Sequence, residues 1–143
     1  MVGLNDSSGD WSNTKAVLDA FPGFGTFAGS EVFLLDNLRG GGVGCITASG
    51  NVNPGGIRKA YEGWQTDQAD ALQARITEIR KTIQAYPMVP ALKVMTAQFA
   101  DDAGWTRTRP PLMPLDKVPA AALLADLDGI GFDMADNRNS VAA

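Results

Sequence analysis

Apolar residues occur along the first third of the chain in short runs that are separated by amphipathic segments. Three such runs predict strands, at residues 1–4, 24–28 and 43–48. The third run is apolar at consecutive positions, which is typical of a parallel strand covered on both faces. Between the runs, segments that begin after Asp10 and Ser30 predict capped helices. This alternation predicts an α/β fold of βα units with parallel strands.

The rest of the chain has the periodicity of helices, with apolar residues three or four positions apart. The expected starting points of these helices are Pro54, Asp67, Pro90 and Pro119. Proline fits a first helical turn because the N–H that it lacks has no partner there. Residues 107–115 are rich in proline and predict an extended link before the last helix.

These patterns divide the chain into three parts. Residues 1–53 hold the βα units, residues 54–128 are helical, and residues 129–143 form a small polar tail that we expect to be frayed. Three strands do not close a barrel, so the sheet is expected to have two open edges, and open edges favour association. The sequence therefore predicts a homo-oligomer or a partner that supplies further strands.

The composition narrows the chemistry that the chain can perform. Its 143 residues include 12 Lys and Arg against 16 Asp and Glu, a net charge of −4 without a basic run, which argues against a nucleic-acid partner. Histidine is absent and Cys45 is the single cysteine, which excludes histidine-based triads, histidine-ligated metals and internal disulfides. We expect no metal and no cofactor. Cys45 lies in an apolar run and is expected to be an inert core residue.

Nothing in the sequence directs the chain to a membrane. No segment is apolar for long enough to span a bilayer, and the first residues lack the basic and apolar regions of a signal peptide. A single cysteine fits a reducing compartment. We therefore expect a cytoplasmic protein without a membrane partner.

Two polar or glycine-rich segments fit more than one interpretation. Residues 6–10 fit an anion-binding loop or a turn followed by a helix cap. Residues 40–44 fit a nucleotide-binding loop or a helix end with a tight turn. No Lys-Ser/Thr pair follows these glycines, and they end a helix instead of opening one, so the turn interpretation is favoured.

Four blocks of the sequence resemble, in order, the signatures of one family. They are GLNDSSGD at 3–10, AGSE at 28–31, GGVGCIT at 41–47 followed by Asn51-Val52, and the helical-region motifs PALK at 90–93 and RPPLMPL at 109–115. Over residues 1–128 the chain resembles the C-terminal half of the dihydrodipicolinate synthase/N-acetylneuraminate lyase family. The resemblance implies a partial TIM (β/α)8 barrel, made of strands six to eight with their helices, plus a C-terminal helical extension.

The resemblance also implies a chemistry and a site. In that family a lysine amine forms a Schiff base with the keto group of pyruvate or another 2-oxo acid, as in a class I aldolase. The resemblance places this lysine at Asn5, whose amide is not nucleophilic and is not competent for imine formation. The substrate-binding positions that it implies, at the carboxyl ends of the strands, are Gly29, Ser30, Glu31, Ile46 and Thr47.

These expectations describe a member or fragment of a Schiff-base lyase family with pyruvate or another 2-oxo acid as its small-molecule ligand. The five preceding βα units of the family are not in this sequence, so a complementing N-terminal half is an expected partner. Because the lysine is also replaced, we expect the chain alone to be inactive, and whether it is an enzyme stays open. The alternative is a non-enzymatic binding or assembly module that reuses the half barrel.

Overall fold

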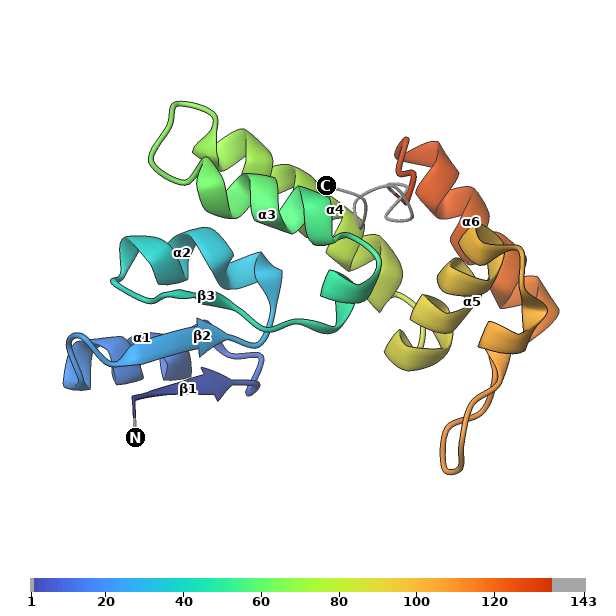
Figure 1. The fold of residues 1–143 in the computed structure, drawn as a ribbon, viewed down its shortest axis with the longest axis horizontal. Helices are drawn as coiled ribbons and strands as arrows, with labels where there is room; N and C mark the ends of the chain where they lie inside the picture. Colours follow the sequence, from blue (N-terminus) through green and yellow to red (C-terminus); the bar gives the residue numbers. More distant parts are fainter. Residues whose placement is uncertain (1, 135–143) are drawn as a thin grey trace, which may run out of the picture.

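The structure, a computed structural model, describes residues 2–134. Three parallel strands form one sheet in the order β1-β2-β3 (Figure 1), namely β1 (Gly3–Asp6), β2 (Gly25–Ala28) and β3 (Gly44–Cys45). The α-helices are α1 (Trp11–Ala20), α2 (Leu34–Arg39), α3 (Pro54–Glu62), α4 (Ala69–Gln84), α5 (Met88–Ala100) and α6 (Lys117–Gly129). Short 3-10 helices are η1 (Glu31–Phe33), η2 (Ala48–Asn51) and η3 (Ala103–Thr106). The α/β class and the parallel pairing are confirmed.

Local capping explains where the first two helical segments begin. The Asp10 carboxylate accepts a hydrogen bond from Ser12 N at 2.9 Å, and the Ser30 hydroxyl accepts one from Val32 N at 3.3 Å. Each of these bonds satisfies an N–H of a first helical turn that has no partner within the helix. Both predicted caps are confirmed, although the segment after Ser30 begins as η1 and continues as α2.

The helices α1 and α2 cover one face of the sheet. Thr14 Oγ1 of α1 donates to Asp6 Oδ2 at 2.5 Å, and Asn37 Nδ2 of α2 donates to the carbonyl oxygen of Thr26 at 2.9 Å. Asp6 and Thr26 are both buried. Successive side chains on a strand point to opposite faces, so Asn5 and Phe27, which are next to Asp6 and Thr26 on their strands, face away from α1 and α2.

The hydrophobic core lies mainly between helices. One cluster joins α2, α3 and α4 through Leu34, Leu38, Ala60 and Ile76. A larger cluster joins α4, α5 and α6 through buried side chains that include Ile79, Ile83, Leu92, Met95, Leu123 and Leu127. Since α4 contributes to both clusters, it connects the βα units to the C-terminal helices, as its central position in Figure 1 shows.

Two strands differ in their bounds from the prediction. The strand β1 lies two residues later than the expected run 1–4, and β3 holds two residues in place of the expected run 43–48. The chain leaves β3 early because the hydroxyls of Thr47 and Ser49 bind the carboxylate of Glu31, which turns the backbone into η2. Sequence periodicity does not report such a contact between distant residues.

Three helix starts also differ from the prediction. The helix α4 begins at Ala69 without a side-chain cap, and not after a cap at Asp67. The helices α5 and α6 begin at Met88 and Lys117, two residues before the expected starts. In each of them proline is the third helical residue, where its missing N–H still costs no hydrogen bond.

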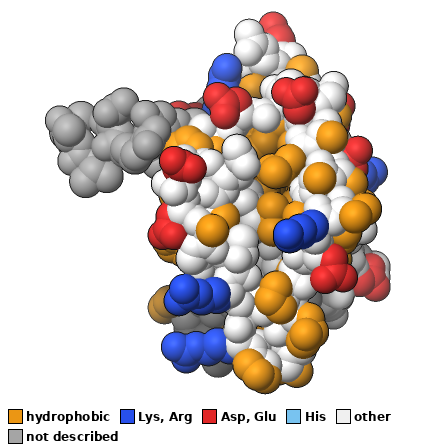
Figure 2. All heavy atoms as spheres, turned by 90° about the vertical axis from the view of Figure 1, so that its right-hand side faces the viewer, with side chains coloured by type: hydrophobic (Ala, Val, Ile, Leu, Met, Phe, Trp, Pro, Cys, Tyr) orange, Lys and Arg blue, Asp and Glu red, His pale blue; other side chains and the backbone are white. Residues whose placement is uncertain are grey.

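The C-terminal helices carry an extended arm. Residues 107–115 contain no helix or strand, as expected of the link, and project from the end of the molecule (Figure 1). Apolar side chains gather on the face presented by this end (Figure 2). Met113, which belongs to the arm, is exposed. Ile130 and Phe132 begin the tail that was expected to be frayed, but they pack against the larger cluster. Residues 135–143 of that tail lie outside the described residues.

Candidate functional site

Asn5, Phe27 and Gly44 lie side by side across the sheet. Asn5 is in register with Phe27, and Phe27 is in register with Gly44. Side chains in register on parallel strands point to the same face, so this row faces away from α1 and α2. Asn5 is exposed, and its Nδ2 donates to Ser7 Oγ at 3.0 Å. The position assigned to the family's lysine is thus on the open face, near the carboxyl end of β1, but it presents only an amide.

An open groove of about 610 Å³ lies between β3 and α3. Phe27, Ile46 and Tyr61 are among the residues that line it, and Ile46 is 57% exposed. A Cβ on Gly44 would lie 3.6 Å from the ring of Phe27 and 3.8 Å from the ring of Tyr61, and its φ of +152° disfavours any other residue. The largely apolar groove continues the face that carries Asn5.

The exits of β1 and β2 touch at Gly29. Gly29 N donates to the carbonyl oxygen of Asp6 at 2.7 Å, and a Cβ on Gly29 would lie 2.5 Å from the same oxygen and 2.7 Å from Ser7 Cα. Only glycine allows this approach. Ser30 follows directly and is half-buried at the start of η1. Both residues lie just beyond the carboxyl end of β2, where the sequence predicted substrate contacts.

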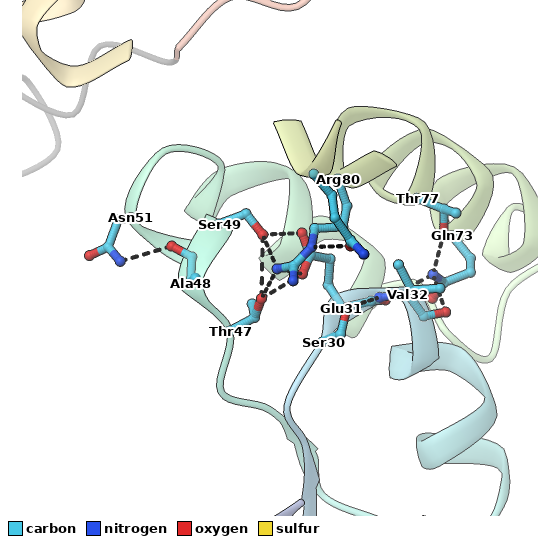
Figure 3. A network of polar contacts seen from close by, with 11 residues as sticks. Ser30, Glu31, Val32, Thr47, Ala48, Ser49, Asn51, Gln73, Thr77 and Arg80 are labelled. Carbon is cyan, nitrogen blue, oxygen red and sulfur yellow. Dashed lines mark hydrogen bonds and ion pairs between the residues drawn. The ribbon is translucent and has the colours of Figure 1, made fainter. Parts of the chain in front are cut away.

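Glu31 is fully buried at the centre of a polar network (Figure 3). Thr47 Oγ1 donates to Glu31 Oε2 at 2.6 Å, and Ser49 Oγ donates to Glu31 Oε1. Arg80 Nη1 on α4 lies 3.4 Å from Glu31 Oε2 and donates to Thr47 Oγ1 at 3.0 Å and to Ser49 Oγ at 3.2 Å. The Arg80 side chain is 13% exposed, so the two charges compensate each other in a region nearly closed to water.

This network fixes the orientation of two of the predicted substrate contacts, Glu31 and Thr47. The Thr47 hydroxyl donates to Glu31 and accepts from Arg80, so its hydrogen is already engaged. The structure brings Glu31 and Thr47 together with their polar atoms turned toward each other. Ile46 instead reaches the groove, and Gly29 lies at the exit of β2.

Sequence reasoning missed Ser49, Gln73 and Arg80, which complete the network (Figure 3). Ser49 gave no signal, because serine after a strand is ordinary. Arg80 directly follows Ile79, which is one of the buried residues of α4. A charged residue beside a buried helical stripe is a signal for an ion pair, but it does not identify the partner.

Residues 6–10 form a turn and a helix cap. Ser8 N donates to Asp6 Oδ1 at 3.0 Å, and Asp10 caps α1. Burial works against the charge of Asp6, but hydrogen bonds from Thr14, Ser8 and Asn13 outweigh it and lower the pKa of Asp6 to about 2. The acceptors of this segment serve its own backbone and α1, which confirms the interpretation as a turn with a cap.

The glycine-rich segment 40–44 ends α2, where Gly40 N donates to the carbonyl oxygen of Asp36 at 2.9 Å. This confirms the interpretation as a helix end. Cys45 follows in β3 and is half-buried. Burial, and to a lesser degree the charge of Glu31, raise the pKa of the Cys45 thiol to about 11. At neutral pH the thiol is therefore protonated, which makes it a poor nucleophile. Cys45 also lines the groove, so it is not the fully buried core residue that was expected.

Within residues 2–134, every lysine lies on a helix. These lysines are Lys15, Lys59, Lys81, Lys93 and Lys117. Two of them have partners there: Lys15 forms an ion pair with Asp19, and Lys93 donates to the carbonyl oxygen of Trp105. In the same part of the chain, no group of three or more His, Cys, Asp or Glu residues is placed to hold a metal ion. Over this range, too, no helix is long and apolar enough to cross a membrane.

Known proteins resemble the chain over most of its length. A family model for the dihydrodipicolinate synthetase family matches residues 1–129. An uncharacterized DapA-like lyase of Chloroflexus aurantiacus is 35% identical over 129 residues, which cover 90% of this chain and 43% of the relative. A second uncharacterized DapA-like lyase, from Halobacterium salinarum, is 33% identical, and the match covers 92% of this chain and 44% of that relative. An N-acetylneuraminate lyase of Lactiplantibacillus plantarum is 26% identical, with 85% and 42% covered. The chain thus spans less than half the length of these curated relatives.

Solved structures share the fold. Dihydrodipicolinate synthase of Agrobacterium tumefaciens matches with a TM-score of 0.77 and 25% identity, covering 91% of this chain and 43% of that one. YagE of Escherichia coli, a prophage protein of the same family in complex with pyruvate, matches with a TM-score of 0.81 and 23% identity, covering 93% and 47%. Both are TIM barrels, so the three-stranded parallel sheet is consistent with part of such a barrel. Because the family model covers nearly the whole chain and the relatives agree with it, the chain belongs to the dihydrodipicolinate synthetase family.

Proposed function

We propose that this chain is the C-terminal part of a Schiff-base lyase barrel that acts on pyruvate or another 2-oxo acid. In this proposal β1, β2 and β3 are strands six to eight, and the chain supplies one wall of the substrate site. The observation that carries the proposal is the position of Asn5, which the family's motif assigns to the lysine and which lies exposed beside Phe27 near the carboxyl end of β1.

The chemistry explains why the chain alone is proposed to be inactive. In a Schiff-base lyase, the lysine amine adds to the keto carbon and water leaves, which yields a protonated imine that withdraws electrons from the bonds that react. The amide nitrogen of Asn5 has no available lone pair for the addition. The described lysines lie on helices, whereas Asn5 lies on β1, so none of them occupies the position that the family's motif assigns to the lysine.

The ligand class follows from relatives and from the wall itself. YagE and a dihydrodipicolinate synthase of Acinetobacter baumannii are described in complex with pyruvate. We propose that Gly29, Ser30 and Ile46 face such a ligand, while Glu31 and Thr47 shape the wall from within it. Ser30 Oγ accepts from Val32 N, which leaves its own O–H to donate to a carboxylate or hydroxyl of the ligand.

The partner that we propose is a complementing N-terminal half or, failing that, a second copy of the chain. The groove beside β3 is lined by Phe27, Ile46, Ile57 and Tyr61, and Tyr61 is 45% exposed. Further strands paired with β3 would cover these side chains and remove an open sheet edge. The single cysteine fits a cytoplasmic site of action.

Borohydride reduction in the presence of pyruvate tests the proposal, because it converts an imine to a stable amine that mass spectrometry detects. We expect no adduct on the natural chain. We expect an adduct at position 5 of the Asn5→Lys variant when the N-terminal half of the Chloroflexus aurantiacus relative is present. An adduct on the natural chain contradicts the proposed inactivity. If the assembled variant binds the N-terminal half but gives no adduct, the Schiff-base assignment of position 5 is wrong.

A non-enzymatic binding module is the second candidate. It is favoured by Asn5 itself, whose amide is tied to Ser7 and has no role in imine chemistry. Calorimetric titration of the natural chain with pyruvate separates the two functions. Binding of pyruvate without an adduct favours the module, whereas binding only after Asn5→Lys and assembly favours the lyase barrel.

A further inference from the structure

Two long polar side chains on one side of α4 reach the turns that follow β2 and β3 (Figure 3). Gln73 and Arg80 are seven residues apart, which is about two helical turns, so they lie on the same side of the helix. Gln73 Oε1 accepts from Leu35 N at 2.9 Å, and Gln73 Nε2 donates to the carbonyl oxygens of Glu31 and Val32 at 2.9 and 3.1 Å. Gln73 therefore holds the backbone that leads from η1 into α2.

Arg80 holds the side chains of both turns. Its guanidinium donates to Thr47 and Ser49, which flank the start of η2, and pairs with Glu31, which starts η1. Glu31 and Ser49 are fully buried. Within the described residues, the other ion pairs join side chains that are 40% exposed or more, so this pair differs from them in burial.

Burial makes these contacts costly to displace. In a site nearly closed to water, a donor or carboxylate that loses its partner has no solvent to replace it. Small displacements of Arg80 or Glu31 therefore cost more than those of an exposed pair, and the turns are held in one arrangement. Residues Ser30 and Ile46 lie next to the held positions.

We propose that Gln73 and Arg80 are positioning residues, which set the substrate-facing turns at 29–33 and 46–49 from a helix outside the sheet. In this proposal they act on the ligand through the turns and not by direct contact. The assignment of a 2-oxo acid to these turns rests on the function proposed above, whereas the bracing of the turns by α4 does not. Neither Gln73 nor Arg80 belongs to the family signatures found in the sequence.

The chain offers a matched control on the same helix. Arg75 of α4 also donates to backbone carbonyl oxygens of another segment, those of Ile130 at 2.8 Å and Gly131 at 2.9 Å. It serves the end of α6 and not the turns. Comparing substitutions of Arg75 and Arg80 therefore separates the general effect of removing an arginine from α4 from the specific effect of removing Arg80.

The first experiment measures backbone hydrogen exchange by mass spectrometry on the full chain, for Arg80→Gln and Arg75→Gln. We expect exchange in residues 29–33 and 46–52 to rise about tenfold or more in Arg80→Gln relative to Arg75→Gln. Arg80→Lys is expected to recover part of the protection, because lysine keeps the charge beside Glu31 but loses the fork of donors. An equal rise in both glutamine variants overturns the proposal.

If Arg80→Gln fails to fold, the double variant Glu31→Gln/Arg80→Gln removes both charges and leaves no unpaired buried ion. It is expected to show the same selective rise in the two turns. Protection equal to that of Arg75→Gln overturns the proposal here as well.

The second experiment uses borohydride trapping by Asn5→Lys, assembled with the N-terminal half of the relative, over a series of pyruvate concentrations. Adding Arg80→Gln is expected to raise the half-saturating pyruvate concentration about tenfold, and adding Arg75→Gln is expected to leave it unchanged. Loosened turns with unchanged half-saturation overturn the positioning role. If Asn5→Lys gives no adduct at all, the proposed function fails, and the exchange experiment still decides whether Arg80 braces the turns.

Discussion

The Asp6 carboxylate is expected to make the stability of this chain depend on pH in the acid range. Hydrogen bonds from Thr14 and Ser8 lower its pKa from an ordinary value of 3.8 to about 2, against the opposing effect of burial. The ionised form is therefore favoured in the folded state. The difference corresponds to about 2 kcal/mol of stability, present above pH 3.8 and lost as the pH falls through about 2. About half of it is lost near pH 3.

The perturbation is Asp6→Asn, which keeps the shape but not the charge, and the assay is urea unfolding between pH 6 and pH 2. The variant is expected to be less stable than the natural chain by about 2 kcal/mol at pH 6, with a gap that closes toward pH 2. Asp19→Asn is the control, because Asp19 is an exposed partner of Lys15, and such pairs contribute little. A gap for Asp6→Asn that is the same at pH 6 and pH 2 would refute the reasoning.

Three further predictions concern other parts of the chain. Gly29→Ala places a Cβ 2.5 Å from the Asp6 carbonyl oxygen and is expected to lower the free energy of unfolding, measured in urea, by about 2 kcal/mol or more. Gly55→Ala is the control, because its Cβ meets no atom within 4 Å, and it is expected to be neutral or slightly stabilising. Ile83→Ala empties a fully buried position in the larger cluster and is expected to cost about 2–5 kcal/mol by thermal or urea unfolding, with Ile83→Val losing less. Cys45 is expected to react slowly with thiol reagents at pH 7 and faster as the pH rises toward 11, so rapid labelling at neutral pH would contradict the raised pKa.

Helix starts illustrate how far local patterns reach. The caps Asp10 and Ser30 are predictable because a cap bonds to an N–H only two residues away. The starts at Pro90 and Pro119 were placed too late, because proline is tolerated through the whole first turn and does not specify which position it occupies. The bounds of β3 were wrong for a different reason, since they depend on Glu31 and not on residues next to the strand.

The candidate site shows the same division. Asn5 and Gly29 are readable in the sequence only because they stand in blocks that resemble the family's motifs. The close approach of two strand exits that requires glycine at position 29 became visible in the structure. Ser49 and Arg80 are not readable as site residues. Serine and arginine occur in many surroundings, and their role depends on what they face.

By itself, the sequence determined the family signatures, the parallel βα order and the asparagine at position 5, where the resemblance places a lysine, since these follow from residue types and from periodicities over a few positions. Only the tertiary structure decided that Asn5 and Phe27 share an open face, and that Arg80 reaches Glu31 across 49 positions of sequence. The physical reason is that such contacts arise from the packing of α4 against the βα units. Neighbours along the chain carry no record of that packing.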